Sequence, residues 1–201
     1  MHQTRHPTSD KLVGTTVELL ESKRPDEIAV DDILALSGIS KGSLYHHFED
    51  LNELLEVAQI VRYSNWVDRS IELLARVISS SITREEFLSG LSQVTNLTQS
   101  SEYSQVRAER VRTIANAQAN PRFTIALGAE QERLTLAISD VIRDAVARGI
   151  YRSDLNIRVA AVFIQSYTLG KIVDDITTEH MDSEDWNSLI YEITDRVFFT
   201  K

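Results

Sequence analysis

Residues 40–47 carry the side chains of this sequence that are best suited to contact a phosphate or a base edge. The outer positions of the segment are small or hydrogen-bonding: Ser40, Lys41, Gly42, Ser43, Tyr45, His46 and His47. Hydroxyl, ammonium and imidazole groups bind phosphate oxygens and the base edges of a major groove. A helix that begins after Ser40 would also point backbone N–H groups outward, which favours an anion.

Two short helices joined by a turn must position these side chains. Apolar spacing predicts a first helix from Val30, and Gly38 supplies the permissive backbone of the turn. Ser40 can cap a second helix, through His46, because its hydroxyl can accept a backbone N–H. We expect the inner side of this helix-turn-helix to consist of Ile33, Leu34, Gly38, Ile39, Leu44 and Phe48.

The string from Gly38 to Tyr45, followed by Phe48, resembles the helix-turn-helix of the tetracycline-repressor (TetR) family of transcriptional regulators. The resemblance covers roughly residues 10–58. It implies a DNA-binding domain over residues 6–66 and a helical ligand-binding and dimerisation domain over residues 67–201. The function implied is that of a homodimeric, ligand-responsive repressor on a near-palindromic DNA operator, with a small-molecule effector of unknown identity.

The resemblance gives the outer residues their expected roles. Ser40, Lys41 and Tyr45 would contact phosphates, whereas Ser43, His46 and His47 would lie at base edges or beside them. Arg5 and His6 could add a minor-groove contact.

The net charge of the N-terminal segment supports an alternative to tight DNA binding. Residues 1–50 hold five Lys or Arg against nine Asp or Glu, a net charge of −4, and Leu51 stands where the family usually has a lysine. A basic footprint is therefore absent. The alternative is a protein-interaction module whose helix-turn-helix no longer binds DNA tightly.

An arginine cluster surrounds the segment 103–119, which we expect to be a helix. Arg107 and Arg110 share one face with Tyr103 and Ile114, and these four could bind an anionic effector. The alternative is a solvated face on which the arginines pair with Glu102 and Glu109.

No pattern in the sequence favours an enzyme or a cofactor. Asp174, Asp175, Glu179 and His180 could do acid–base chemistry, but we expect them to be the solvated end of a helix. His2 and His6 have a metal-ligand spacing without a third ligand nearby, so we expect no metal. The sequence contains no glycine-rich phosphate loop, no G-x-S-x-G and no H-E-x-x-H motif.

Apolar periodicity predicts an all-α fold of about nine helices. The expected starts are Ser9, Val30, Ser40, Asp50, Thr83, Tyr103, Pro121, Asp154 and Ser183. The fourth helix either continues through Ile78 or breaks near Asn65, and the eighth is expected to run to Ile176.

The last two helices have the apolar character of an interface. By the resemblance they build the dimer contact, to which we assign Phe163, Tyr167, Gly170, Trp186, Ile190, Ile193 and Val197. The alternative is burial in a monomeric core.

The composition indicates the cellular compartment that we expect for the protein. The chain has 201 residues, a net charge of −9 and no cysteine, which excludes disulfides and cysteine-ligated metals. Neither an apolar run of membrane-spanning length nor a secretory signal is present, so we expect a cytoplasmic protein without a membrane partner.

Overall fold

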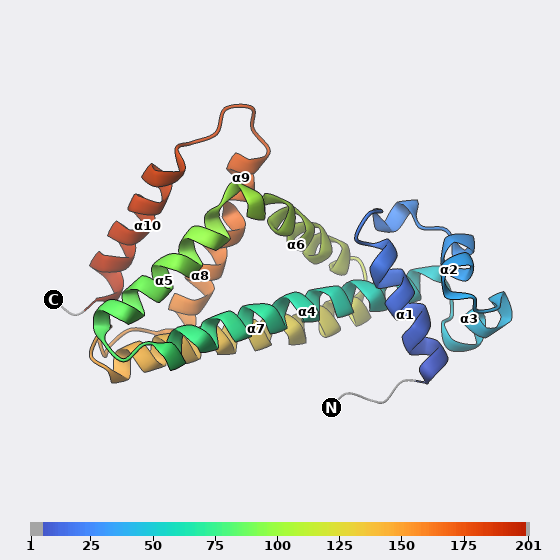
Figure 1. Ribbon diagram of the computed structural model, residues 1–201, viewed down its shortest axis with the longest axis horizontal. Coiled ribbons are helices and arrows are strands. Elements are labelled where there is room, and N and C mark those ends of the chain that lie inside the picture. Colours follow the sequence, from blue (N-terminus) through green and yellow to red (C-terminus); the bar gives the residue numbers. More distant parts are fainter. Residues whose placement is uncertain (1–5, 200–201) are drawn as a thin grey trace. The chain divides into compact units, whose positions relative to one another are not determined.

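The computed structural model describes residues 6–199, and these residues form helices joined by short connections (Figure 1). The elements are α1 (Pro7–Leu19), η1 (Pro25–Glu27), α2 (Val30–Ser37), α3 (Lys41–His47), α4 (Leu51–Ser80), α5 (Arg84–Gln99), η2 (Ser101–Tyr103), α6 (Ser104–Ala117), α7 (Pro121–Ala147), α8 (Ile157–Gly170), α9 (Ile172–Asp175) and α10 (Ser183–Phe198).

The all-α prediction is confirmed. Nine of the α-helices have seven residues or more, and α9 is a single turn of four. Residues 6–199 contain no strand, and their one β-bridge, between Tyr151 and Phe199, is isolated.

The chain divides into two compact units, residues 1–66 and 67–201, and α4 contributes to both. Within residues 6–199, no helix has the combination of length and apolar character that crossing a membrane requires.

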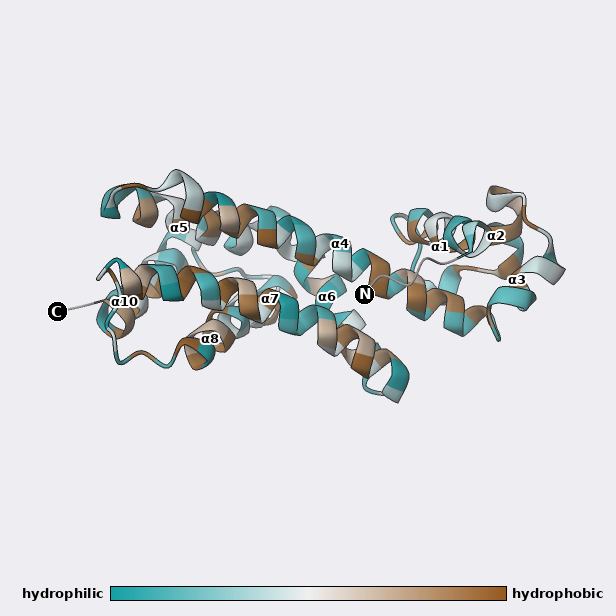
Figure 2. Ribbon diagram, turned by 90° about the horizontal axis from the view of Figure 1, so that it is seen from below, coloured by the Kyte–Doolittle hydropathy of each residue, from teal (hydrophilic) through white to brown (hydrophobic). Residues whose placement is uncertain are grey.

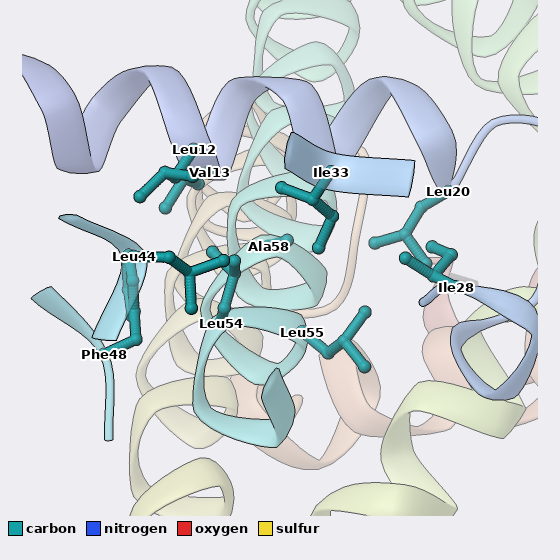
Figure 3. Packing of buried hydrophobic residues seen from close by; sticks show 10 residues of the cluster. All are labelled: Leu12, Val13, Leu20, Ile28, Ile33, Leu44, Phe48, Leu54, Leu55 and Ala58. Atoms are coloured by element: carbon teal, nitrogen blue, oxygen red, sulfur yellow. The ribbon is translucent and has the colours of Figure 1, made fainter. Parts of the chain in front are cut away.

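The N-terminal unit is built around one apolar cluster (Figure 3). Its ten buried residues come from α1, α2, α3, α4 and the positions directly after α1, η1 and α3: Leu12, Val13, Leu20, Ile28, Ile33, Leu44, Phe48, Leu54, Leu55 and Ala58. Of the residues expected inside, Ile33, Leu44 and Phe48 are buried, and Leu34 and Ile39 pack on the cluster half-buried. Burial of this cluster holds three helices too short to be stable alone.

Local capping signals fix most helix ends. The Thr83 hydroxyl accepts the Glu86 N–H over 3.2 Å, and the Glu86 carboxylate accepts the Thr83 N–H over 2.9 Å. The backbone N–H groups of Thr83 and Ile82 both donate to the Glu86 carboxylate, and they hold its pKa below its ordinary value. Asn120 caps α7 directly before Pro121, and Gly149 follows α7 with φ +70°. The predicted starts at Thr83 and Pro121 are confirmed.

The first helix begins at Pro7 and not at Ser9, and both boundaries of α8 also differ from prediction. The cap of α8 is Asn156, whose side chain accepts the Val159 N–H over 3.1 Å, and not Asp154. Both residues are good caps, and sequence alone does not separate them. The helix then ends at Gly170, and a separate turn, α9, follows it.

In the C-terminal unit, α7 packs against α6 and α8, and α10 packs against α5. The hydropathy colouring changes along α7 and α10 between brown and teal, as amphipathic helices require (Figure 2). A buried polar network joins α7 to α8, since Gln165 donates to Thr135 Oγ1 over 3.1 Å and accepts from Gln131.

Candidate nucleic-acid interface

The turn before α3 is set by Gly38 and Ser40. Gly38 has φ +66°, a conformation that strains a residue with a Cβ, and its N–H donates to Leu34 O over 2.9 Å. Ser40 caps α3, because its Oγ accepts the Ser43 N–H over 3.2 Å. The Ser40 hydroxyl also donates to Ser43 Oγ over 3.1 Å. The predicted turn and cap are therefore both confirmed.

The inner and outer faces of α3 separate as the sequence indicates. Leu44 is fully buried and Phe48, which ends the helix, is 6% exposed. The opposite face is exposed at Ser40, Lys41, Gly42, Tyr45 and His46, whereas Ser43 and His47 are half-buried. A row of small and polar groups thus projects away from the core that holds the helix.

A histidine cluster lies at the C-terminal end of α3. The His6 and His47 rings stack with centroids 5.0 Å apart and planes inclined by 28°. The His47 ring meets His46 edge-on at 5.2 Å. His6 is the N-cap of α1, and its Nδ1 accepts the Thr8 N–H over 3.3 Å. His6 is thus a helix cap, whereas Arg5 and His2 lie outside the described residues.

Carboxylates already neutralise part of the positive charge of the N-terminal unit. Lys23 lies 3.0 Å from Asp32, and Arg24 lies 3.2 Å from Glu27. Asp32 also accepts the Ala29 N–H, and this hydrogen bond, followed by that from Lys23, lowers the pKa of its carboxyl group. Within residues 6–199, Lys11 and Lys41 make no ion pair. Lys41 is therefore the cation of α3 that is available to an external anion.

Comparison with solved structures returns transcriptional regulators of similar fold. A protein from Mesorhizobium loti MAFF303099, described as a TetR-family transcriptional regulator, is 15% identical over 96% of this chain and 97% of its own, with a TM-score of 0.71. A TetR-family regulator from Cytophaga hutchinsonii is 15% identical over 99% and 100%, with a TM-score of 0.68. A regulator from Saccharomonospora viridis in complex with choline is 14% identical over 96% and 98%, with a TM-score of 0.68.

This is the TetR fold. The likeness spans both units, although identity is low. No family model matches the sequence, and no curated protein matches it.

Two arginines of α6 in this TetR-like chain, Arg107 and Arg110, are buried, which contradicts the solvated face considered as the alternative for them, whereas Arg112 is exposed. Arg107 is fully buried and Arg110 is 5% exposed. Arg107 forms a two-pronged ion pair with Asp175, at 2.6 and 2.7 Å, and donates to the carbonyls of Thr98 and Ser100. Its guanidinium therefore joins α6 to α9 and to the end of α5, and four hydrogen bonds already occupy it.

Of the four residues expected at a solvated helix end, Glu179 and His180 are exposed, whereas Asp174 and Asp175 are not. Asp175 is 7% exposed at its side chain, and buried Lys171 lies 3.2 Å from it. Burial opposes the charged form of Asp175, but hydrogen bonds from Arg107 and Lys171 outweigh it, so the pKa of this carboxyl lies below its ordinary value. Asp174 accepts the Met181 N–H over 2.9 Å, which lowers its pKa, and lies 3.6 Å from His180. In the described part of the chain, no group of three or more acidic or histidine side chains forms a metal site.

The expected dimer residues divide between two faces. Phe163, Gly170 and Val197 are exposed, and Tyr167 and Ile193 are half-buried. Trp186 and Ile190 instead face their own unit: the Trp186 indole donates to Gln99 Oε1 over 2.9 Å, and Ile190 is 5% exposed. These two side chains thus lie on the side of α10 that packs against α5 of the same chain.

The exposed apolar side chains of α8 and α10 include three residues that were not predicted from the sequence. Val159, Val162 and Leu189 are 63%, 47% and 47% exposed. Spacing along α8 could have found the first two, since Val159, Val162, Phe163 and Gly170 share one helical stripe. Ring contact between Phe163 and Phe198, with centroids 6.3 Å apart, shows that the two helices adjoin.

The Arg107–Asp175 pair makes a direct prediction. Asp175→Asn leaves the buried Arg107 without its counter-charge, and we expect the free energy of unfolding at pH 7 to fall by about 3 kcal/mol. Because the pKa of Asp175 is lowered, its contribution is present above the ordinary aspartate pKa and is lost as pH falls. The difference between the two proteins should therefore shrink below about pH 4, as urea unfolding followed by circular dichroism would measure.

Asp154→Asn is the control, since this side chain is 74% exposed beside Arg152, and we expect a change below about 0.5 kcal/mol. Equal losses of unfolding free energy in Asp175→Asn and Asp154→Asn would contradict the role of Asp175 as the counter-charge of Arg107.

Proposed function

We propose that this chain is a DNA-binding transcriptional regulator that reads DNA with α3. The observation that carries the proposal is the division of α3 into a buried apolar side and an exposed side of small and hydrogen-bonding residues. A helix held in this way matches the recognition helix of a helix-turn-helix, which lies in the major groove. The TetR fold of the chain supports the same role, because the proteins that share it are transcriptional regulators.

Each outer residue receives a role from its position. Lys41 and Tyr45 bind phosphate oxygens, together with the backbone N–H groups that follow Ser40. His46 reaches base edges, and His47 lies beside them with its orientation held by the His6 ring. Ser40 and Ser43 share a hydrogen bond, so each hydroxyl contacts DNA only with its remaining hydrogen-bonding capacity.

The regulator acts as a homodimer through the exposed faces of α8 and α10. An apolar surface of this kind, with Phe163, Val162 and Leu189 on adjoining helices, is suited to a two-fold contact with a second copy. Two reading helices related by that symmetry match a near-palindromic operator.

A small-molecule effector controls release from DNA, and the protein acts as a repressor. The Saccharomonospora viridis regulator holds choline, which supports ligand binding by this fold. Of the four expected effector residues, Arg107 is committed to Asp175, so we assign binding to Tyr103, Arg110 and Ile114 in the C-terminal unit. An effector changes operator affinity only if it binds the two states of the regulator unequally.

The neutralised cations favour a second candidate function. With Lys23 and Arg24 held by carboxylates, the N-terminal unit could serve as a protein-interaction module, for which Leu36, 50% exposed, and Tyr45, 46% exposed, offer apolar contact area. A measurement of affinity for duplex DNA distinguishes the DNA-binding regulator from the interaction module.

Substitutions on α3 test DNA reading. Lys41→Ala should weaken binding to all duplexes alike and lower the slope of log affinity against log salt by about one, because one phosphate contact is lost. Tyr45→Ala should cost about 1 kcal/mol, through one lost hydrogen bond. Fluorescence anisotropy with labelled duplex DNA at several salt concentrations measures both effects.

Arg143→Ala is the matched control, because it removes an exposed cation of the C-terminal unit that pairs with Asp140. Equal DNA affinity of Lys41→Ala, Tyr45→Ala and the unsubstituted protein would favour the interaction module.

The dimer face makes its own prediction. Phe163→Asp places a charge in the apolar surface and should convert the dimer to a folded monomer, because burying an unpaired carboxylate is costly. Ile82→Asp is the control, since Ile82 is 89% exposed in the turn between α4 and α5, and it should remain dimeric. Sedimentation equilibrium measures the mass of each variant. A dimeric mass for Phe163→Asp would contradict the assignment of this face to the dimer contact.

A further inference from the structure

We propose that His46 and His47, in the cluster that their rings form with His6, are proton-controlled DNA contacts, so that DNA affinity rises as pH falls from about 8 to about 6. The inference deepens the proposed function and rests on it. It starts from the scarcity of available cations, since carboxylates hold Lys23 and Arg24 while Lys41 stands alone on α3.

His46 and His47 occupy the last turn of α3, where the helix dipole favours a positive charge. His46 is exposed and His47 is half-buried, so solvent or a phosphate reaches both. Each imidazole that takes up a proton becomes an additional cation with two N–H donors. Proton uptake would thus add up to two positive charges beside Lys41 on the outer face of α3.

The surroundings of His6 differ from those of His46 and His47. Its Nδ1 accepts the Thr8 N–H at the start of α1, which requires an unprotonated Nδ1 and a proton on Nε2. The His6 ring stacks on that of His47 and holds its orientation.

Other charged groups lie on every element around the cluster. Asp10 and Lys11 follow His6 on α1, Lys41 and Tyr45 share α3, and Glu49, Asp50 and Glu53 lie at the start of α4. The carboxylates have the charge opposite to that of an imidazolium, and the two lysines have the same charge. Asp50 and Glu53 also cap α4, since Asp50 accepts the Glu53 N–H over 2.8 Å and Glu53 accepts the Glu49 N–H over 2.6 Å. DNA phosphates add a stronger attraction for protons, so binding and protonation reinforce each other.

The test measures the affinity of the full chain for a labelled mixed-sequence duplex at pH 6 and pH 8 over a series of salt concentrations. We expect several-fold tighter binding at pH 6, with a log–log salt slope steeper by about one for each histidine that becomes charged. His46→Gln and His47→Gln should each remove part of this difference, and the double variant should remove nearly all of it. Glutamine keeps a polar side chain but does not titrate.

His180→Gln is the matched control, because it removes a histidine of the C-terminal unit that lies beside Asp174. It should retain the full pH dependence. Binding of equal strength and equal salt slope at both pH values would overturn the inference while the proposed function stands. A pH dependence that survives in the double variant would overturn it as well. Failure of the folded protein to bind duplex DNA at either pH would overturn both.

Discussion

Burial of Leu44 and Phe48 in the N-terminal cluster is the constraint on which the candidate function depends. The helix α3 has seven residues, about two turns, and helices of this length do not persist in water by themselves. Its orientation therefore comes from packing. With these two side chains inside, the helical period leaves Lys41, Tyr45 and His46 outside. Gly38 and Ser40 then decide where the helix begins, through the turn at φ +66° and the hydroxyl cap.

The ion pairs of the two units differ in burial and in what they do. In the N-terminal unit, cations near the surface pair with carboxylates of neighbouring turns, so little positive charge remains for a ligand. In the C-terminal unit, one buried carboxylate, Asp175, joins Arg107 of α6 to Lys171 at the end of α8. Such a pair contributes little net stability when intact but strongly disfavours loss of either partner. It therefore specifies where α9 packs on α6.

Local signals allowed the fold and the reading helix to be predicted from sequence. Gly38, Ser40, the Thr83–Glu86 pair and Pro121 act within four residues of the boundaries they set, so their effect is visible in the chain itself. The partner of Arg107 lies 68 residues away, and no periodicity relates the two positions. Likewise, the apolar stripe of α10 was visible, but whether Trp186 faces a partner or α5 depends on Gln99, which lies 87 residues before it. The His6–His47 stack was missed for the same reason, because it joins the ends of two helices.

The most direct test of DNA reading by α3 is selection of bound sequences from a random duplex library by the purified protein at low salt. If α3 of each subunit reads one half-site, the selected sequences should share a two-fold symmetric motif, with half-sites about one helical turn apart. Substitution at His46 should then change the preferred base at one symmetric pair of positions. Absence of any enriched motif, with the protein folded and dimeric, would contradict the account and leave the N-terminal unit as a protein-interaction module.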